Sequence, residues 1–293
     1  MSHLSRKYTC PSEWTYQTLE AFNIHVLMVE PEDFFGQHYV AASVAAIPPL
    51  IFDIDNINEA VQRAPGDIIK YFDYLNLATT LPQESTVDCL VQETLRLLHF
   101  DAQRLLVVQH FRYPFEMCGK AVTTETDVAL IHPSLLLLLI AVEDKPFTPL
   151  KYPEPQVIAE AIAAFQYNNE RRRDMGLDPL SAWSVPCMTM RGATPTLYVV
   201  DVTDELSRAI IHGDYPETAT TVRRCKGSWL KGSGDWVVTS GGIEKKGFRR
   251  AMFRDLDAFR LLARELRAPL HPIFAQEDND EATHAAAPTG SQV

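Results

Sequence analysis

The sequence predicts an α/β fold, in which a central sheet carries helices on both faces. The order of elements in the middle of the chain is helix, three strands, helix, strand, between about residues 85 and 203. The third of these strands, Leu135–Val142 (LLLLLIAV), is apolar along its whole length. Such a run indicates a strand that is buried on both faces, so helices must cover both sides of the sheet.

Each element of this core has a local signal. Residues 85–100 place apolar side chains on one side of an amphipathic helix, with Ser85 as the candidate N-cap. Residues 104–119 and 121–132 have strand character and flank a turn signal at Gly119-Lys120. Pro133-Ser134 then separates the second strand from the apolar third strand. The helix at 153–173 has proline available for its first turn and alanine through its body.

The flanking segments complete the expected fold. Residues 22–30 read as a strand, and two further strands surround a turn at Gly192. A short helix that Gly213 ends and a long helix at 248–267 follow. We expect residues 1–80 to form an extension that packs on a core domain at 81–275. Residues 276–293 have no packing pattern and are expected to be disordered.

Composition limits the classes of protein. The 293 residues are 46 % hydrophobic, which is enough for a sizeable core. The five cysteines are far apart, which argues against a zinc ribbon or a disulfide framework. No secretory signal is evident at the N-terminus, and the longest apolar run is too short to span a bilayer. These features predict an intracellular protein, nuclear or cytoplasmic, without a membrane partner.

The net charge of −11 is unlike that of a typical nucleic-acid-binding protein, but the charge is uneven. Residues 165–270 hold 17 Lys and Arg against 13 Asp and Glu, whereas the remainder holds 10 against 25. Basic clusters occur at 171–173, 223–226 and 245–250. Phosphate binding requires only a local patch, so these clusters leave a nucleic-acid partner open. The alternative is that each cluster is an ordinary solvated surface.

Two carboxylates are expected to meet at one rim of the sheet. Asp127 lies on the second core strand, and Glu143, Asp144 and Lys145 follow the apolar third strand. If these strands pair as a hairpin, Asp127 and Glu143 come together and repel unless a cation or proton lies between them. Oxygen ligands favour Mg²⁺ or Mn²⁺. Side-chain alternation puts Glu143 and Lys145 on one face, which favours Glu143 over Asp144 as the side-chain ligand.

This Asp-x15-Glu-x-Lys arrangement, with a helix before and after it, resembles the PD-(D/E)XK (restriction-endonuclease-like) nuclease superfamily. The resemblance implies an α-β-β-β-α-β core with a central mixed sheet, and a metal-dependent nuclease in residues 81–275. It assigns Mg²⁺ (or Mn²⁺) to Asp127, Glu143 and the carbonyl of Asp144, and water positioning to Lys145. In some branches a Gln on the next helix supports the site, which matches Gln156. The first core helix often carries a Glu, and Glu93 fills that role.

A narrower resemblance is to a group of uncharacterised fungal proteins. The shared motifs read here as 21–24 (AFNI), 34–36 (FFG), 126–128 (TDV), 143–145 (EDK), 153–169 (PEPQVIAEAIAAFQYNN) and 195–203 (PTLYVVDVT). The longest of these motifs is specific, whereas the Asp and Glu-x-Lys pattern also occurs at many unrelated strand ends. No proline precedes Asp127, although that proline is often absent in the superfamily.

Three hypotheses follow from the sequence. The first is a hydrolase that cleaves phosphodiester bonds in nucleic acid, DNA in preference to RNA. The second is a catalytically inactive relative that binds nucleic acid or protein through the same cleft. The third is an interaction or host-defence protein in which the fold is only a scaffold. Taken singly, each site residue also has an ordinary interpretation: a strand-end cap for Asp127, a surface ion pair for Glu143 with Lys145, and solvated helix residues for Gln156 and Glu93.

Overall fold

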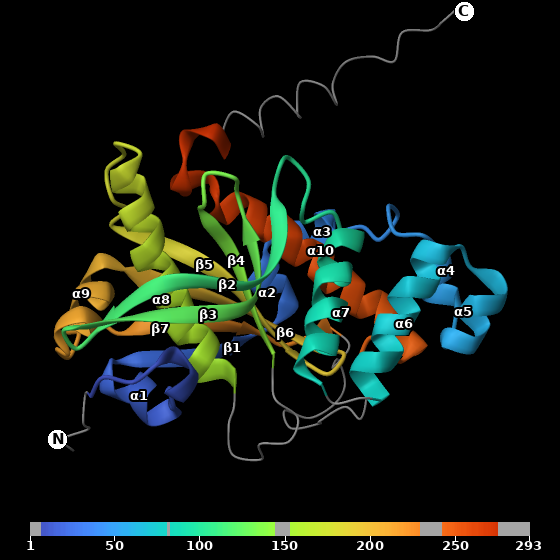
Figure 1. Ribbon diagram of the computed structural model, residues 1–293, viewed down its shortest axis with the longest axis horizontal. Helices are drawn as coiled ribbons and strands as arrows, with labels where there is room; N and C mark the ends of the chain where they lie inside the picture. Colours follow the sequence, from blue (N-terminus) through green and yellow to red (C-terminus); the bar gives the residue numbers. More distant parts are fainter. Residues whose placement is uncertain (1–6, 81–82, 144–152, 229–241, 275–293) are drawn as a thin grey trace, which may run out of the picture.

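The computed structural model describes residues 7–80, 83–143, 153–228 and 242–274. It is an α/β fold around a seven-stranded mixed sheet with the strand order β1-β7-β6-β5-β4-β3-β2 (Figure 1). Two neighbouring pairs are parallel, β1 with β7 and β4 with β5. The other neighbours are antiparallel. The predicted sheet with helices on both faces is therefore confirmed.

The strands are β1 (Ile24–Val29), β2 (Leu106–Met117), β3 (Lys120–Ile131), β4 (Leu137–Glu143), β5 (Ala182–Arg191), β6 (Thr194–Thr203) and β7 (Thr220–Cys225). The α-helices are α1 (Tyr16–Ala21), α2 (Pro31–Phe35), α3 (Gln37–Ala41), α4 (Leu50–Asp53), α5 (Ile57–Arg63), α6 (Gly66–Thr80), α7 (Glu84–Leu97), α8 (Pro153–Asp174), α9 (Asp204–His212) and α10 (Lys246–Leu266). Short 3₁₀ turns lie at Pro11–Glu13 (η1) and Ala268–Leu270 (η3).

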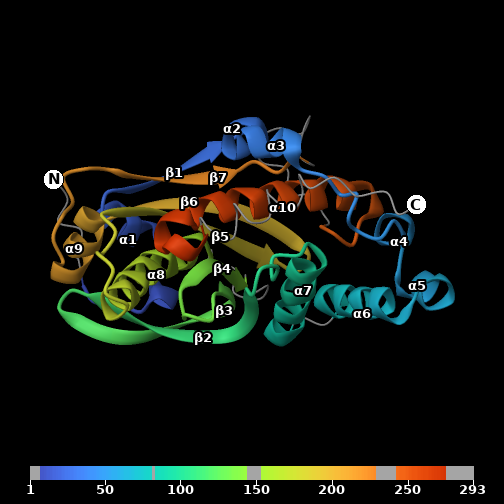
Figure 2. The same cartoon turned by 90° about the horizontal axis from the view of Figure 1, so that it is seen from above.

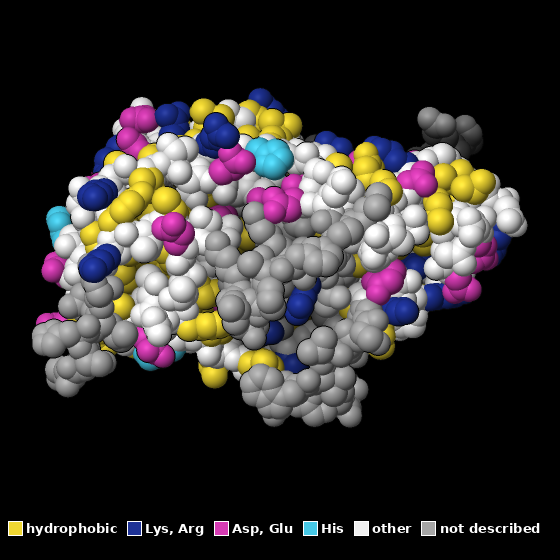
Figure 3. Space-filling view, turned by 60° about the horizontal axis from the view of Figure 1, so that its bottom comes forward, with side chains coloured by type: hydrophobic (Ala, Val, Ile, Leu, Met, Phe, Trp, Pro, Cys, Tyr) yellow, Lys and Arg dark blue, Asp and Glu magenta, His cyan; other side chains and the backbone are white. Residues whose placement is uncertain are grey.

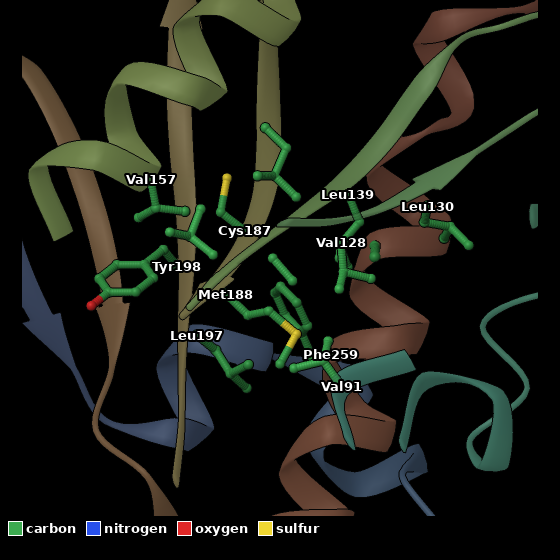
Figure 4. Packing of buried hydrophobic residues seen from close by; sticks show 14 of the residues in the cluster. Val91, Val128, Leu130, Leu139, Val157, Cys187, Met188, Leu197, Tyr198 and Phe259 are labelled. Atoms are coloured by element: carbon green, nitrogen blue, oxygen red, sulfur yellow. The ribbon is translucent and has the colours of Figure 1, made fainter. Parts of the chain in front are cut away.

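Helices cover the two faces of the sheet because side chains alternate along each strand. On one face, Val157 of α8 packs beside Cys187 and Tyr198 (Figure 4). On the other face, the neighbouring residues of the same two strands pack toward α7 and α10, where Val91 and Phe259 lie. Strand β4 lies between these layers, and its residues from Leu137 to Val142 are at most 2 % exposed. This double cover explains why the strand is apolar throughout.

Helix α8 is the central element of its layer, and two asparagines fix it to the strands. The side chain of Asn168 accepts from Leu137 N at 2.9 Å and donates to Leu137 O at 2.7 Å. Asn169 does the same for Leu180, at 2.7 and 3.0 Å. Main-chain groups at both strand entries thereby gain partners inside the core. The paired asparagines in the 153–169 motif thus have a structural role.

The N-terminal segment contributes a strand to the sheet. Strand β1 pairs with β7 at one edge, and α2 and α3 pack against α10 (Figure 2). Ser43 N donates to the Asp257 carboxylate at 2.8 Å, and His38 bonds to Glu265. One hydrophobic cluster runs from Trp14 to Phe274. The segment expected as an extension therefore shares the hydrophobic core of the main domain.

Most of the predicted elements are confirmed, with shifted ends. The strand break at Pro133-Ser134, the turn at Gly192 and the helix stop at Gly213 are all present, and Gly213 adopts the left-handed conformation at φ 75°. The prediction of Ser85 as an N-cap was wrong. Helix α7 begins at Glu84 with Gln83 as N-cap, two residues before the predicted cap, and no side chain caps it. The predicted disordered segment 276–293 lies outside the described residues.

A close backbone approach at Gly242 gives a testable prediction. Ile243 N donates to Ala193 O at 2.7 Å, and a Cβ at position 242 would lie 2.1 Å from that oxygen. Because main chain cannot yield as a flexible side chain does, we expect Gly242→Ala to destabilise the protein by about 1–3 kcal/mol. Urea unfolding measures this loss, with Gly247→Ala as the control because no atom lies within 4 Å of its added Cβ. Equal stability of the two variants would contradict the prediction.

Candidate active site

The first two predicted site residues lie on neighbouring strands. Asp127 is on β3 and Glu143 is the last residue of β4, and these strands pair antiparallel from Val128↔Ala141 onward. The hairpin expected from the sequence is therefore confirmed. The side chain of Glu143 and the residues Asp144 and Lys145 lie outside the described part of the chain.

Asp127 lies where the β2–β3 ladder turns from one face of the sheet toward the other. The side chain of Gln109 donates to Cys89 Sγ of α7 at 3.9 Å. Two residues later, the ring of Phe111 packs edge-on against Tyr167 of α8. Residues two apart normally share a face, but His110 between them has φ 54°, a left-handed conformation that reorients the strand. Asp127 lies beside His110 on the neighbouring strand β3, between Thr126 and Val128. It can therefore interact with groups from both helical layers.

Glu160 of α8 is the first of two acidic residues near Asp127 that the sequence did not single out. It is 1 % exposed, and its Oε1 accepts from Gln156 Nε2 at 3.0 Å. Burial raises the pKa of Glu160 to about 8, and the charge of Asp127 contributes in the same direction. The predicted site residue Gln156 therefore holds Glu160, and the carboxyl group of Glu160 is protonated at neutral pH.

Asp88 of α7 is the second acidic residue near Asp127 that the sequence did not single out. It is 2 % exposed, and burial raises its pKa to about 7, with a further rise from the charge of Asp127 and an opposing effect of His110. Asp88 and Glu160 thus approach Asp127 from opposite helical layers. Their raised pKa values keep two of the three carboxyl groups wholly or partly protonated, which relieves mutual repulsion. Three acidic groups therefore share one electrostatic environment at the rim of the sheet.

Glu93, the acidic residue predicted for the first core helix, contacts basic side chains of α6 and α7. Its carboxylate lies 2.8 Å from Lys70 Nζ of α6 and 3.4 Å from Arg96 Nη1. These contacts connect α7 to α6. The acidic residue that α7 brings into electrostatic contact with Asp127 is Asp88, five positions earlier. A signal for it exists in the sequence, because Asp88 adjoins Val87 and Val91 on the buried stripe of the helix.

Among the described residues, no group of three or more His, Cys, Asp or Glu side chains is arranged to hold a metal ion. That set does not contain the side chains of Glu143 and Asp144. The Oε2 atom of Glu160 is buried without a hydrogen-bond partner in the described part of the protein. Mg²⁺ and Mn²⁺ prefer ionised carboxylate oxygens, so a protonated Glu160 is not among the proposed ligands.

Two arginines of the basic clusters in the C-terminal half are buried and engaged in internal contacts. Arg172 is 8 % exposed and donates to the carbonyls of Asp178, Pro269 and Leu270. Arg249 is completely buried. On the face shown in Figure 3, basic and acidic side chains are interspersed outside the grey residues. Their sequence clustering therefore does not produce a broad basic surface on that face.

The cluster at 223–226 is also paired with acidic side chains. Arg224 Nη1 lies 3.4 Å from Glu154, and Lys226 Nζ lies 2.9 Å from Glu30. Arg223 lies 3.6 Å from Asp201. Glu154 is buried, whereas the other two pairs are more exposed and contribute little to stability. Each pair partially neutralises a cation that would otherwise attract phosphate. These three residues join β7 to its neighbours.

Comparison with protein-family models found no matching family, and comparison with curated proteins found no match. In the part of the chain that the structure describes, no helix has the length and apolar character needed to cross a lipid bilayer.

Glu160 gives a prediction for the pH dependence of stability. Its folded pKa of about 8 lies above the value of about 4.3 expected in the unfolded chain. Between these values the folded state binds one proton more, so the free energy of unfolding falls as pH rises. We expect Glu160→Gln to remove this part of the slope and to be more stable than the wild type above pH 8.

Urea unfolding between pH 5 and pH 9 measures this effect. Glu170→Gln is the matched control, because Glu170 is on the same helix and is exposed. Asp88 and Asp255 also have raised pKa values and contribute their own slope, so the difference between variant and wild type isolates Glu160. An unchanged slope in Glu160→Gln would show that this group is ionised in the folded protein.

Proposed function

We propose that the protein is a metal-dependent hydrolase of phosphodiester bonds in nucleic acid, built on a restriction-endonuclease-like core. The observation that carries the proposal is the position of Asp127 and Glu143 on the paired strands β3 and β4. The element order α7-β2-β3-β4-α8-β5, with β2, β3 and β4 antiparallel and β5 parallel to β4, supports the same core.

The proposed roles follow from the chemistry of each group. Asp127 and Glu143 would hold Mg²⁺ or Mn²⁺ together with the carbonyl of Asp144. The cation would supply Lewis-acid stabilisation of charge on the phosphate. Lys145 would orient the attacking water and oppose developing negative charge. Gln156 keeps the carboxyl group of Glu160 in place at 3.0 Å, and a protonated Glu160 leaves Asp127 free to ionise.

A second function, binding without cleavage, is favoured by a separate observation. Arg172 and Arg249 are used inside the protein, and Arg224 is paired with Glu154. This pairing leaves fewer cations for a long nucleic-acid track than the sequence clusters suggest. The competing proposal is a catalytically inactive module that binds nucleic acid or protein, and the engagement of these cations favours protein as its partner.

One assay separates these proposals. Purified full-length protein is incubated with plasmid, single-stranded DNA and RNA in Mg²⁺, Mn²⁺ or EDTA. We expect cleavage in either metal and none in EDTA. Binding that weakens with salt, without cleavage, would support the binding module. Neither cleavage nor binding of any of these nucleic acids would reject the hydrolase and the nucleic-acid-binding module.

A further inference from the structure

Strand β1 forms one edge of the sheet, and one side of its main chain is open. Asn23 O accepts from Thr220 N at 2.9 Å, and Val29 O accepts from Lys226 N at 2.8 Å, so both residues direct their carbonyls toward β7. In a strand beside a parallel neighbour, every second residue bonds to that neighbour. The residues between those that bond to β7 direct their N–H and C=O groups outward, and these are Ile24, Val26 and Met28. In the part of the chain that the structure describes, no strand pairs with this side of β1.

The opposite edge of the sheet, formed by β2, is protected against further pairing. Strand β2 contains Pro114, which has no N–H to donate, and the charged Arg112. The side-chain amide of Gln166 on α8 bonds to both main-chain groups of Glu116, at 2.9 and 3.2 Å. Strand β1 (Ile24–Val29) has no proline, lysine, arginine or acidic residue. Edge strands without such features are the ones that readily pair with another strand.

A groove of about 350 Å³ lies beside the open edge, between α1, β1 and the first turn of α8. Leu19 of α1 and Ile24 and Val26 of β1 give it an apolar floor. Tyr16 and Met28 also line it and are 43 % and 46 % exposed. The volume corresponds to roughly twelve water molecules, which is enough for a long side chain. A strand that pairs with β1 places every second side chain over this groove.

The groove carries an excess of negative charge. Glu20 and Glu154 line it together with one cation, Arg224, which lies 3.4 Å from Glu154. Glu20 is exposed, and in the described part of the protein its carboxylate makes no ion pair. A lysine or arginine side chain complements this groove, because its hydrocarbon stem packs on the apolar floor while its charged end reaches Glu20.

The C-terminal end of β1 is acidic as well. Glu30 follows the strand directly and pairs with Lys226 at 2.9 Å. Helix α2 then begins with Glu32 and Asp33 in its first turn. Three carboxylates therefore stand against one ammonium group at this end of the strand. The charge at both the groove and the strand end favours a basic partner.

The other face of β1 requires a different side chain. Leu27 is 57 % exposed there, so an added strand gains most from an apolar residue beside it. The two faces together select a strand in which apolar and basic residues alternate. A second copy of this chain does not fit that description, since its own β1 has no basic residue and brings the same acidic groups.

We propose that the open edge of β1 binds an extended segment of a partner protein in which apolar and basic residues alternate. The segment adds to the sheet as a further strand. Hydrogen bonds to the outward main-chain groups of β1 supply affinity, and the groove selects the basic side chains. Four strands separate β1 from β4 and the hydrolase site, so this interaction is independent of the proposed reaction.

Fluorescence anisotropy of the full chain with a labelled peptide that alternates valine and lysine tests the proposal. We expect saturable binding that weakens as salt is added. A peptide that alternates valine and glutamate is expected to bind at least about tenfold more weakly. N-methylation of every second residue blocks only one edge of an extended peptide. Methylation at the valines and methylation at the lysines are therefore expected to have unequal effects, with a loss of at least about tenfold in one of the two.

Two variants of the edge itself locate the binding. Met28→Pro removes an outward N–H and leaves the bonds between β1 and β7 in place, so it is expected to weaken peptide binding at least about tenfold. Met28→Thr keeps the N–H and is the matched control, with an expected loss well below that of the proline variant. Circular dichroism establishes that both variants are folded.

A variant of the groove tests the charge. Glu20→Gln is expected to weaken binding of the lysine peptide by about two- to fivefold, the range of an exposed ion pair. Glu116→Gln removes the same charge from an exposed position on β2, at the other edge of the sheet, and is expected to bind the peptide like the wild type.

Several results would overturn the proposal. Absence of binding to the wild type would show that the edge does not accept such a segment. Equal affinity for the glutamate peptide would remove the preference for basic residues. Unchanged affinity of both N-methylated peptides would mean that charge alone, without strand pairing, holds the peptide. A dimer of the free chain in size-exclusion chromatography that Met28→Pro dissociates would assign the edge to a second copy.

Discussion

Asp127→Asn and Lys145→Ala are each expected to lower Mg²⁺-dependent cleavage by about 10²–10³-fold, and these are the largest effects we predict on activity. Loss of one group that stabilises transition-state charge typically costs about 2.7–4 kcal/mol of barrier. The asparagine variant weakens cation binding, so excess Mn²⁺ is expected to restore part of its activity. The alanine variant removes the proposed water-positioning ammonium, so added metal is not expected to rescue it.

Single-turnover cleavage of a labelled duplex gives the rate for each protein. The matched control for Asp127→Asn is Asp201→Asn, because Asp201 is on β6 beside Arg223 and its side chain is 43 % exposed. Circular dichroism establishes that all three variants are folded. Wild-type rates in both Asp127→Asn and Lys145→Ala would assign the activity to another site.

Arg249→Ala is expected to destabilise the protein by about 3–5 kcal/mol, the largest effect we predict on stability. The guanidinium of Arg249 is buried and donates to four carbonyls: Ile51 at 2.7 Å, Ile54 at 2.7 Å, Ile243 at 2.7 Å and Glu244 at 3.1 Å. It also lies over the ring of Phe72. Alanine leaves a cavity lined by acceptors without donors, and each such group costs about 1–3 kcal/mol.

Urea unfolding at pH 7 measures the loss. Arg250→Ala is the control, because Arg250 is next in the sequence and its side chain lies over Phe52 at an exposed position. We expect a cost below about 1 kcal/mol for the control. Arg249→Lys is expected to remain strongly destabilised, since one ammonium cannot reproduce donors that point in several directions. A wild-type midpoint for Arg249→Ala would mean that water replaces the guanidinium without cost.

The long elements were predictable because their patterns are strong. An amphipathic α7, an alanine-rich α8 and the apolar β4 each follow from the order of residues along the chain. The helices between Pro31 and Arg63 were not predicted. Each of α2 to α5 has only four to seven residues, and prolines interrupt the segment. Such short helices depend on packing against α10 and the rest of the core, which a local pattern does not contain.

The site was predictable only in part, for a similar reason. The strand positions of Asp127 and Glu143 could be predicted because the break at Pro133 indicates a hairpin between the two strands. Asp88 and Glu160 were missed because their importance depends on burial by both helical layers, which tertiary structure determines. Arg172 and Arg249 show the converse error, since both belong to charge runs that suggest a solvated surface but are buried among carbonyls.

The pairing of β1 with β7 has a consequence for the order in which the chain folds. Ile24 lies opposite Thr220, 196 residues later, whereas β2 and β3 meet across a short turn. At a synthesis rate of about 5–20 residues per second, the residues of β1 are synthesised roughly 10–40 s before those of β7. The local hairpin has ample time to form in that interval. The first strand to leave the ribosome is therefore among the last to join the sheet, and a nascent chain that stops before Thr220 leaves it without its neighbour.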